Sequence, residues 1–294
     1  MSKNSNMTGL KLGLIGTGIG RSRAPELHRL AGRICGIELG YELIDLASAP
    51  ADAFDATLEA CRAQGYRGVN VTHPYKERAL AQVHVDSDSV RRLGAVNTVL
   101  FGDKDRPMRG FNTDYTGFMK AFAARFPGAP PGRVAIIGAG GVGRAIAFGL
   151  VALGARAIRL FDEDAQRCAR LAESLRENAF VDVIVCERIE QASAGADGLV
   201  NATPVGMHKY PGTPLPGELI GAQSWAFDAV YTPAETRFLR DARSAGLEVL
   251  GGYELFFHQG VDAFGLFTGV DPDEQKLRDA LDAAGANAAQ RGAG

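Results

Sequence analysis

The segment that most constrains the fold of this chain is a glycine-rich turn near its middle. Residues 133–137 form a short apolar run rich in valine and isoleucine, which predicts a buried strand. Gly138, Gly140 and Gly143 follow in G-x-G-x-x-G spacing, and the apolar residues of 145–153 fall on one face of a helix. In such a turn the backbone approaches a pyrophosphate closely, and the helix N-terminus holds it. The segment therefore predicts the first strand–turn–helix unit of a dinucleotide-binding domain.

The residues after this turn indicate which dinucleotide binds. A second apolar run, 157–161, ends at Asp162, about 20 residues beyond the last motif glycine, where an acid accepts a hydrogen bond from a ribose hydroxyl. Glu163 and Asp164 follow, and three carboxylates would repel an adenosine 2′-phosphate. We therefore expect NAD rather than NADP. Arg167 is read either as a wall of the adenine pocket or as a solvated arginine. The expected cofactor contacts are Gly138, Gly140, Gly141, Val142, Gly143, Asp162, Arg167 and, at a later strand end, Thr203.

Bulk composition excludes several classes of protein. The chain has 294 residues, enough for two domains, and its net charge of −2 gives no reason to expect nucleic acid as a partner. No apolar run is long enough to span a membrane, and the first residues lack the apolar core of a signal peptide. The four cysteines form no Cys-x-x-Cys pair, and no cluster has metal-ligand spacing. We expect a cytoplasmic protein without a metal.

A second glycine-rich segment, 16–20, lies after an apolar run near the N-terminus, and an acid, Asp45, ends the next apolar run. This pattern imitates the dinucleotide motif, but the following helix is expected to begin near Pro25, since proline suits a first helical turn. The loop before that helix is then too long for a dinucleotide-binding turn. It is better interpreted as a loop that holds a small polar ligand, with Ser22 as a hydrogen-bonding group.

Several polar residues lie where predicted strands end and helices begin. Lys76 follows the strand 68–72 in a first helical turn, and Asp114 precedes the helix 115–125, where the local pattern favours an N-cap. Asn97 interrupts an apolar run. Local pattern alone gives these residues ordinary structural roles, and it gives the tail after residue 283 no more than low complexity.

Taken together, the motifs resemble those of the shikimate/quinate dehydrogenase family from Gly16 to about Gly269. The resemblance implies an α/β chain of two domains, with the substrate in the cleft between them. An αβ substrate-binding domain is expected at 1–113 and 253–294, and a Rossmann domain with a doubly wound parallel sheet at 114–252. The segments that carry the resemblance are GVNVTHPYK (68–76), GAVNT (94–98), GFNTDYTGF (110–118), the glycine turn, NATPVGM (201–207), DAVY (228–231) and the helix with Gln259.

The resemblance also implies residue roles. Lys76 and Asp114 match the catalytic pair of the family. Oxidation of a secondary alcohol releases a proton from oxygen and a hydride from carbon, so a lysine that takes the proton and a carboxylate that orients it are sufficient. The implied reaction is reversible oxidation of shikimate to 3-dehydroshikimate, of quinate to 3-dehydroquinate, or both. The positions that match contacts to the substrate's carboxylate and hydroxyls are Ser22, Thr72, Asn97, Tyr231 and Gln259.

One departure from the family pattern bears on the substrate. The first loop often reads Ser-x-Ser-Pro in the family, whereas this chain has Ala24 in place of the second serine. Loss of a hydrogen bond to a charged group costs about 1.5–3 kcal/mol. With the acidic residues at 162–164, this favours a catabolic or specialised NAD-dependent member. The alternatives are a member acting on a related polyol acid, such as an amino-substituted shikimate, and a non-catalytic NAD-binding regulatory protein. The sequence leaves the oligomeric state open, with a homodimer as the candidate.

Overall fold

The computed structural model describes residues 9–103, 106–177 and 181–291, and the chain divides into two compact units. The N-terminal unit comprises Met1–Thr113 and Gly260–Gly294, and the central unit comprises Asp114–Gln259. The expected border at residue 252 lies at the start of a long helix, whereas the units divide inside that helix. Within the described residues, no helix is long and apolar enough to cross a membrane.

The N-terminal unit is built on a five-stranded sheet in the order β2-β1-β3-β4-β5. The first three strands of the chain pair in parallel, and the last two pair antiparallel to their neighbours. Their bounds are β1 (Leu10–Gly16), β2 (Leu39–Asp45), β3 (Gly68–Val71), β4 (Thr98–Leu100) and β5 (Arg109–Phe111). The helices of this unit are α1 (Ala24–Cys35), α2 (Ala53–Ala63), α3 (Lys76–Leu80), α4 (Asp88–Leu93), the second half of α10 (Gly252–Thr268) and α11 (Glu274–Arg291).

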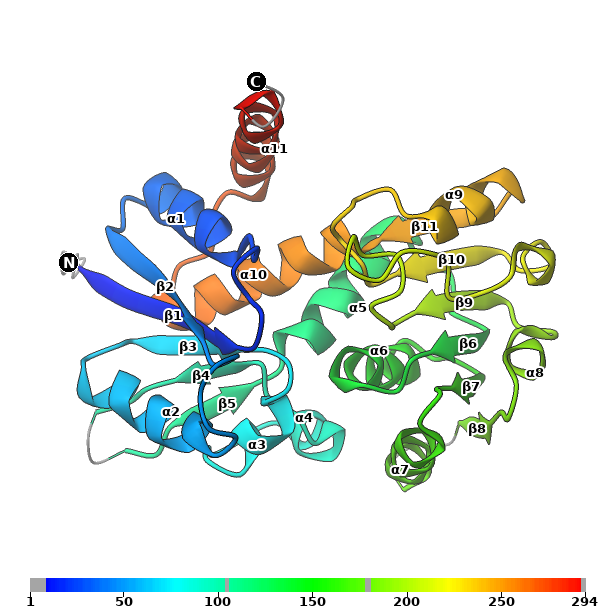
Figure 1. The fold of residues 1–294 in the computed structure, drawn as a ribbon, viewed down its shortest axis with the longest axis horizontal. Coiled ribbons are helices and arrows are strands. Elements are labelled where there is room, and N and C mark those ends of the chain that lie inside the picture. The colour runs from blue at the N-terminus through cyan, green and yellow to red at the C-terminus, as the bar shows by residue number, and fades with distance from the viewer. Residues whose placement is uncertain (1–8, 104–105, 178–180, 292–294) are drawn as a thin grey trace. The chain divides into compact units, whose positions relative to one another are not determined.

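Helices cover both faces of this sheet, with α1 and α10 on one face and α2 on the other (Figure 1). Side chains alternate between the faces along a strand, so one strand contributes to two cores. Leu12 and Leu14 of β1 pack in a cluster with Phe267 of α10, whereas Ile15 packs in a cluster with Phe54 of α2. The two cores fix the sheet from both sides, and the strand ends are left to carry polar residues.

The central unit is a six-stranded parallel sheet in the order β11-β10-β9-β6-β7-β8. In chain order, β6, β7 and β8 extend the sheet towards one edge, and β9, β10 and β11 extend it towards the other edge. The order in which strands are added therefore reverses between β6 and β9, which are neighbours. The strands are β6 (Arg133–Ile137), β7 (Ala157–Phe161), β8 (Asp182–Val185), β9 (Gly198–Asn201), β10 (Trp225–Asp228) and β11 (Glu248–Gly251). This is the doubly wound sheet that the sequence predicts, and dinucleotides bind where such a sheet reverses.

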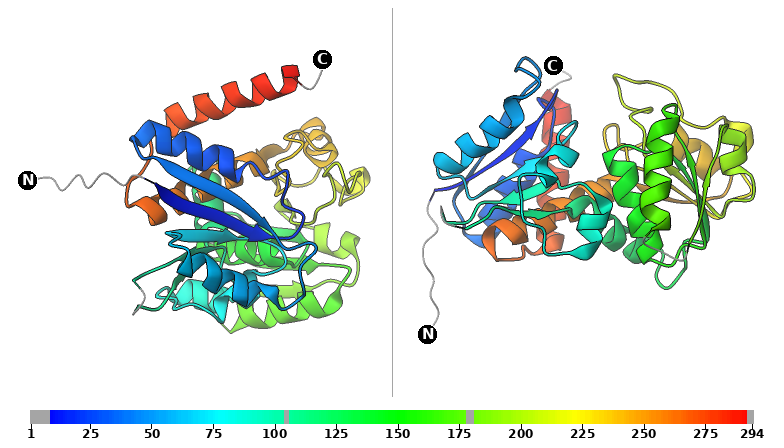
Figure 2. Two further views of the ribbon diagram at one scale, coloured as in Figure 1. Left: turned by 60° about the vertical axis from the view of Figure 1, so that its left-hand side comes forward. Right: turned by 90° about the horizontal axis from the view of Figure 1, so that it is seen from below.

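The helices of the central unit lie on both faces of its sheet, α6 and α7 on one and α8 and α9 on the other (Figures 1 and 2). Their bounds are α5 (Thr113–Arg125), α6 (Gly141–Ala152), α7 (Ala165–Arg176), α8 (Ile189–Ser193), the 3₁₀ turn η1 (Gly217–Leu219) and α9 (Arg237–Ser244). Aromatic rings join α5 to β10: Phe118 lies edge-on to Phe227 at 5.1 Å, and Phe122 lies edge-on to Trp225 at 5.1 Å.

One expectation from the local pattern was wrong, and one helix was not predicted. Asp114 is not an N-cap, because α5 begins one residue earlier and places Asp114 inside its first turn. The low-complexity tail after residue 283 is part of a helix, because α11 continues to Arg291. Alanine has the highest helix propensity, which favours this helix locally. Leu277 and Leu281 of α11 are fully buried, so packing against the rest of the unit also stabilises it.

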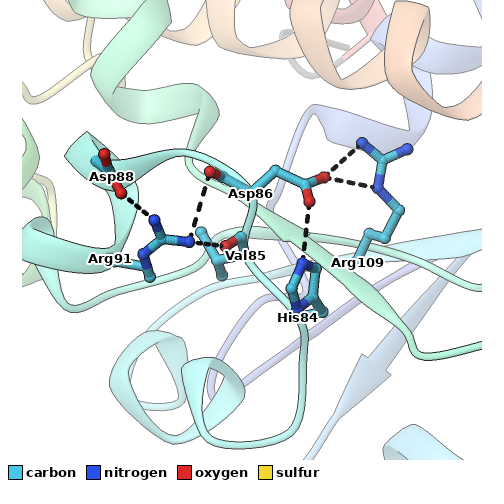
Figure 3. Close-up of polar contacts among 6 residues, drawn as sticks. All are labelled: His84, Val85, Asp86, Asp88, Arg91 and Arg109. Atoms are coloured by element: carbon cyan, nitrogen blue, oxygen red, sulfur yellow. Dashed lines mark hydrogen bonds and ion pairs between the residues drawn. The ribbon is translucent and has the colours of Figure 1, made fainter.

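An exposed ionic cluster fixes the segment before α4, an element that the sequence did not predict (Figure 3). The Asp86 carboxylate accepts hydrogen bonds from Nε and Nη2 of Arg109, at 3.1 and 2.8 Å, and lies 3.0 Å from Nε2 of His84. The Arg109 guanidinium lowers the pKa of Asp86. Arg91 of α4 donates to the carbonyl of Val85 at 2.6 Å. These side chains are about half exposed, so the cluster orders a loop and contributes little to global stability.

Candidate active site

In the glycine turn of the central unit, Gly138 and Gly143 are closely packed, whereas Gly140 faces open space. Gly138 has φ +102°, and a Cβ there would lie 2.8 Å from the carbonyl of Ala202. A Cβ on Gly143 would lie 2.0 Å from the carbonyl oxygen of Gly138, so the helix packs directly on the turn. A Cβ on Gly140 would meet nothing within 4 Å. The backbone at Gly140 therefore faces open space, and the turn has the shape that a pyrophosphate requires.

The start of α6 completes the cradle. Gly140 is the N-cap, with no side chain to cap the helix, and the first turn holds no acidic residue. Gly141, Val142 and Gly143 therefore present backbone N–H groups at the positive end of the helix dipole, where an anion is stabilised. The predicted cofactor residues 138–143 thus lie together around one open turn, and they fit a dinucleotide.

Asp162 lies directly beside this turn, at the end of β7. Its Oδ2 accepts a hydrogen bond from the Ala139 amide at 2.7 Å, and its Oδ1 accepts one from the Asp164 amide at 2.8 Å. The side chain is half-buried, so the carboxylate keeps an accessible side. Arg167 is more than half exposed and pairs with Asp164 at 3.2 Å, which places its guanidinium on the surface of α7.

The segments that follow β9 and β10 are held by two polar side chains that the sequence analysis missed. We call residues 202–206 the β9 loop and residues 229–235 the β10 loop. The Oδ1 of Asn201 accepts from the amide and the hydroxyl of Thr203, at 3.0 and 2.7 Å. The Nδ2 of Asn201 donates to Asp228 at 2.8 Å. Thr203 thus faces Gly138, whose added Cβ would lie 3.0 Å from its methyl group.

Asp228 is fully buried at the end of β10. Its carboxylate also accepts from the amide of Val230 at 2.9 Å and from the hydroxyl of Thr236 at 2.5 Å. Burial raises the pKa of Asp228 to about 6, although these hydrogen bonds act in the opposite direction. The signal for both missed residues was present in the sequence, because Asn201 and Asp228 each end an apolar strand at the carboxyl edge of a parallel sheet.

Three further candidates lie together in the central unit around helices α5 and α10. Gly117, one turn after Asp114, permits α5 to approach α10 closely, since a Cβ there would lie 2.6 Å from the amide nitrogen of Gln259. The ring of Tyr231 stacks on Phe256 at 4.9 Å, and the Gln259 amide donates to the carbonyl of Phe256 at 2.9 Å. Asp114 is 8% exposed. Gln259 therefore packs against α5 one turn from Asp114, and Tyr231 packs against the same helix, α10, that carries Gln259.

The N-terminal unit holds Lys76 and Asn97 in adjacent, rigid positions. Lys76 begins α3 and is 9% exposed, and its carbonyl accepts from the amide of Val96 at 2.9 Å. The neighbouring Asn97 is buried, donates from Nδ2 to the hydroxyl of Thr113 at 3.0 Å and accepts from the Thr113 amide at 2.7 Å. Thr72 follows β3, and its backbone carbonyl accepts from the amide of Tyr75, directly before α3, at 2.9 Å.

The N-terminal glycine-rich segment forms the loop that the sequence predicts. Asp45 accepts from the amides of Gly18 and Ile19, at 2.9 and 3.1 Å, so the acid that imitates a dinucleotide motif holds the backbone of its own loop. These hydrogen bonds lower the pKa of Asp45. Ser22 lies at the end of this loop, and its hydroxyl accepts from the amide of Ala24 at 3.3 Å, directly before α1.

A buried polar network that includes Thr98, Asn70 and Tyr41 supports Asn97, and the sequence did not predict it. The Tyr41 hydroxyl donates to Oδ1 of Asn70 at 2.8 Å, and Nδ2 of Asn70 donates to the hydroxyl of Thr98 at 3.0 Å. Thr98 then donates to Asn97 at 3.0 Å. His28 stacks on Tyr41 at 4.6 Å, and burial lowers its pKa to about 3. Such a network depends on partners that are distant in sequence, so no local pattern predicts it.

Comparison with known proteins relates both units to dehydrogenases. Residues 14–99 match the shikimate dehydrogenase substrate binding domain, and residues 133–210 match the coenzyme F420-dependent NADP oxidoreductases. Quinate/shikimate dehydrogenase (NAD(+)) of Corynebacterium efficiens is 40% identical over 278 residues, which cover 93% of this chain and 98% of that protein. Shikimate dehydrogenase (NADP(+)) of Pseudarthrobacter chlorophenolicus is 40% identical over 273 residues, covering 91% and 92%.

Solved structures show the same relation. Quinate dehydrogenase from Corynebacterium glutamicum in complex with NAD superposes with a TM-score of 0.85 at 37% identity, covering 94% of this chain and 99% of that one. Shikimate 5-dehydrogenase from Thermus thermophilus, in complex with NADP(H) and shikimate, superposes with a TM-score of 0.81 at 37% identity, covering 94% and 99%.

Proposed function

This chain belongs to the shikimate/quinate dehydrogenase family, and from that membership we propose that it is an NAD-dependent oxidoreductase of shikimate and quinate. The observation that carries the proposal is the open glycine turn with the Asp162 carboxylate beside it, 2.7 Å from the Ala139 amide. The central unit then supplies the cofactor site. The N-terminal unit, which matches the substrate binding domain of the family, supplies most of the contacts to the acid.

The preference for NAD follows from the charges near the adenosine end of the turn. Asp162 offers an acceptor to a ribose 2′-hydroxyl, whereas a 2′-phosphate would meet the carboxylates of Asp162, Glu163 and Asp164. Arg167 is the nearby cation, and it pairs with Asp164. Relatives with either cofactor in their names are similar to this chain, so the acidic residues supply the distinction.

The proposed chemistry divides the alcohol's two hydrogens between the cofactor and the protein. NAD, when bound, accepts the hydride from the carbinol carbon. Lys76 takes the hydroxyl proton during oxidation and returns it during reduction, and Asp114 stabilises the resulting ammonium group. The burial of both side chains supports these roles, because a lysine or an aspartate is seldom buried to this extent unless it is paired or has a chemical task.

The remaining contacts hold the acid in place. We assign the carboxylate and hydroxyls of the substrate to Ser22, Thr72, Asn97, Tyr231 and Gln259. With Ala24 in place of a serine, Ser22 is the remaining serine hydroxyl directly before α1, and it accepts a hydrogen bond from the Ala24 amide. The missing second serine hydroxyl is the specific observation that favours a related polyol acid as the second candidate substrate.

The test is the initial rate of NADH or NADPH formation with shikimate and with quinate, each with NAD and with NADP. We expect turnover with NAD and at least one of the two acids, and the ratio of rates gives the preferred acid. Turnover confined to NADP would overturn the cofactor assignment. If the chain binds NAD but turns over neither acid, the second candidate replaces the first, and an amino-substituted shikimate is the next substrate to assay.

We further propose that the protein works in a reducing compartment, the cytoplasm. Cys61, Cys168 and Cys186 are buried free thiols, and Cys35 is a partly buried one, as expected where disulfides do not form. A homodimer stays the candidate assembly, and light scattering would compare the mass in solution with the 31.1 kDa of one chain.

A further inference from the structure

Asp228 is a buried carboxylate whose described donors are all neutral. It is 0% exposed, and its partners are a side-chain amide, a backbone amide and a hydroxyl. Burial of a charge without a cation is costly, so a protein rarely keeps such a residue unless its hydrogen bonds serve a purpose. The fold itself does not require a carboxylate at the end of a strand.

The three donors come from three different segments. Asn201 ends β9, Val230 lies in the β10 loop, and Thr236 is the N-cap of α9, where its hydroxyl also accepts from the Leu239 amide at 3.2 Å. One carboxylate therefore joins the end of a neighbouring strand, the loop after its own strand and the start of the next helix. Removal of the carboxylate would take away the acceptor of all three hydrogen bonds, and Asn201 would keep only its bond to the carbonyl of Val205.

The network continues from Asn201 to the glycine turn. Asn201 fixes Thr203 through two hydrogen bonds, and its Nδ2 also donates to the carbonyl of Val205 at 2.9 Å. The Thr203 hydroxyl accepts from the Val205 amide at 3.1 Å. Ala202 and Thr203 in turn lie against Gly138, as the contacts of its added Cβ show. The shape of the β9 loop next to the cofactor turn thus depends on Asn201, and Asn201 is oriented by Asp228.

We propose that Asp228 is a positioning residue that holds the β9 loop and the β10 loop in the conformation that binds the dinucleotide. The inference rests on the proposed function for its cofactor. The β9 loop carries Thr203, a predicted cofactor contact, and the β10 loop carries Tyr231, a predicted substrate contact, so one buried group sets both. Asp228 itself touches neither ligand, because it is fully enclosed.

Two substitutions at this position separate geometry from charge. Asp228→Ala removes every acceptor. Asp228→Asn keeps the oxygen that accepts from Asn201 and Val230, and its NH₂ group can donate to the Thr236 hydroxyl in place of the bond that Thr236 now donates. A positioning role predicts that asparagine rescues what alanine loses.

Asp197→Ala is the matched control. Asp197 precedes β9 at the opposite end of the strand that carries Asn201, and it too accepts several hydrogen bonds, from the Arg133 amide at 2.8 Å and from Arg156 at 3.2 Å. Its loss should destabilise the same sheet without disturbing either loop. It therefore measures what a merely structural aspartate does to cofactor binding.

The experiment measures the Kd for NAD by calorimetry and the hydrogen exchange of loop peptides in the full-length chain. We expect Asp228→Ala to weaken NAD binding at least about tenfold and to accelerate exchange in both loops. Asp228→Asn and Asp197→Ala should stay within about threefold of the wild-type Kd. An unchanged Kd in Asp228→Ala, or an equal loss in Asp197→Ala, would overturn the proposal.

If Asp228→Ala does not fold, Asn201→Ala replaces it in the experiment. This variant removes the hydrogen bonds to Thr203, so it should also weaken NAD binding. A wild-type Kd in Asn201→Ala would count against the network. If the wild-type chain binds no NAD, the cofactor assignment fails instead. Exchange rates in the two loops would then decide whether Asp228 holds them, and unchanged rates would refute that role as well.

Discussion

Lys76 and Asp114 are each more than nine-tenths buried, at the first turn of a helix in different units. Charged side chains are seldom buried to this extent unless they are paired or have a chemical task. We predict that Lys76→Ala lowers kcat by about 10²–10⁴-fold with a modest change in substrate affinity, because general acid–base catalysis contributes on that order. Steady-state rates and a substrate titration measure the two effects. Lys276→Ala, on the exposed surface of α11, is the control, and near-normal turnover of Lys76→Ala would remove Lys76 from proton transfer.

In the proposed cofactor site, Asp162 is the residue that we expect to distinguish the two nicotinamide cofactors. Its carboxylate is half-buried and already accepts from Ala139 and Asp164, so it is held at the edge of the turn. We predict that Asp162→Ala weakens NAD more than NADP, since it removes both an acceptor for the ribose hydroxyl and a charge that repels a phosphate. The ratio of the two kcat/KM values is the measurement. A ratio equal to that of the wild type would place the ribose elsewhere.

At the scale of the element, the glycine turn makes a sharp pair of predictions. A methyl group on Gly140 meets open space, whereas one on Gly143 meets the Gly138 carbonyl at 2.0 Å. Gly140→Ala should therefore keep the wild-type Tm and lose at least about tenfold in NAD affinity, because the methyl group occupies the place of the pyrophosphate. Gly143→Ala should lower the stability by about 1–3 kcal/mol through overpacking. Thermal melts and NAD titrations of both variants test this, and wild-type affinity in Gly140→Ala would contradict the cradle.

Elements with a strong local signal were predictable, and elements with a tertiary cause were not. The turn at 138–143 and its flanking strands combine apolar runs with glycines, and they were found as expected. The helix α4 was missed because its six residues hold only two buried apolar side chains, Val90 and Leu93, too few to show a helical period, although the Ser87 cap and the left-handed Gly94 mark its ends. Asn70, Asn201 and Asp228 were missed because each has a side-chain partner that lies 27 to 29 residues away. A local pattern marks a strand end as polar but does not say what it binds.

For the whole molecule, the two units carry buried titratable groups that respond to acid in opposite directions. His28, in the N-terminal unit, has its pKa lowered from 6.5 to about 3 by burial, so its stabilising effect is complete above pH 6.5 and is lost as pH falls towards 3. Asp228, in the central unit, has its pKa raised from 3.8 to about 6 by burial, so its stabilising effect is present below pH 3.8 and is lost as pH rises through 6. Asp228 therefore lowers the stability of its unit at neutral pH, as expected of a residue kept for function at the cost of stability.

These opposite signs predict that the two units unfold at different urea concentrations in acid. Between pH 7 and pH 5, His28 should cost the N-terminal unit about 2 kcal/mol, whereas the central unit should gain about 1 kcal/mol from Asp228. Trp225, the only tryptophan in the sequence, is buried in the central unit, so its fluorescence reports that unit, whereas far-UV circular dichroism reports both. We expect the circular dichroism midpoint in urea to fall below the fluorescence midpoint at pH 5. His28→Phe should close this gap by stabilising the N-terminal unit in acid, and Asp228→Asn should narrow it by removing the gain of the central unit. Coincident midpoints in the wild type at both pH values would contradict the prediction, because they would show that the two units unfold as one.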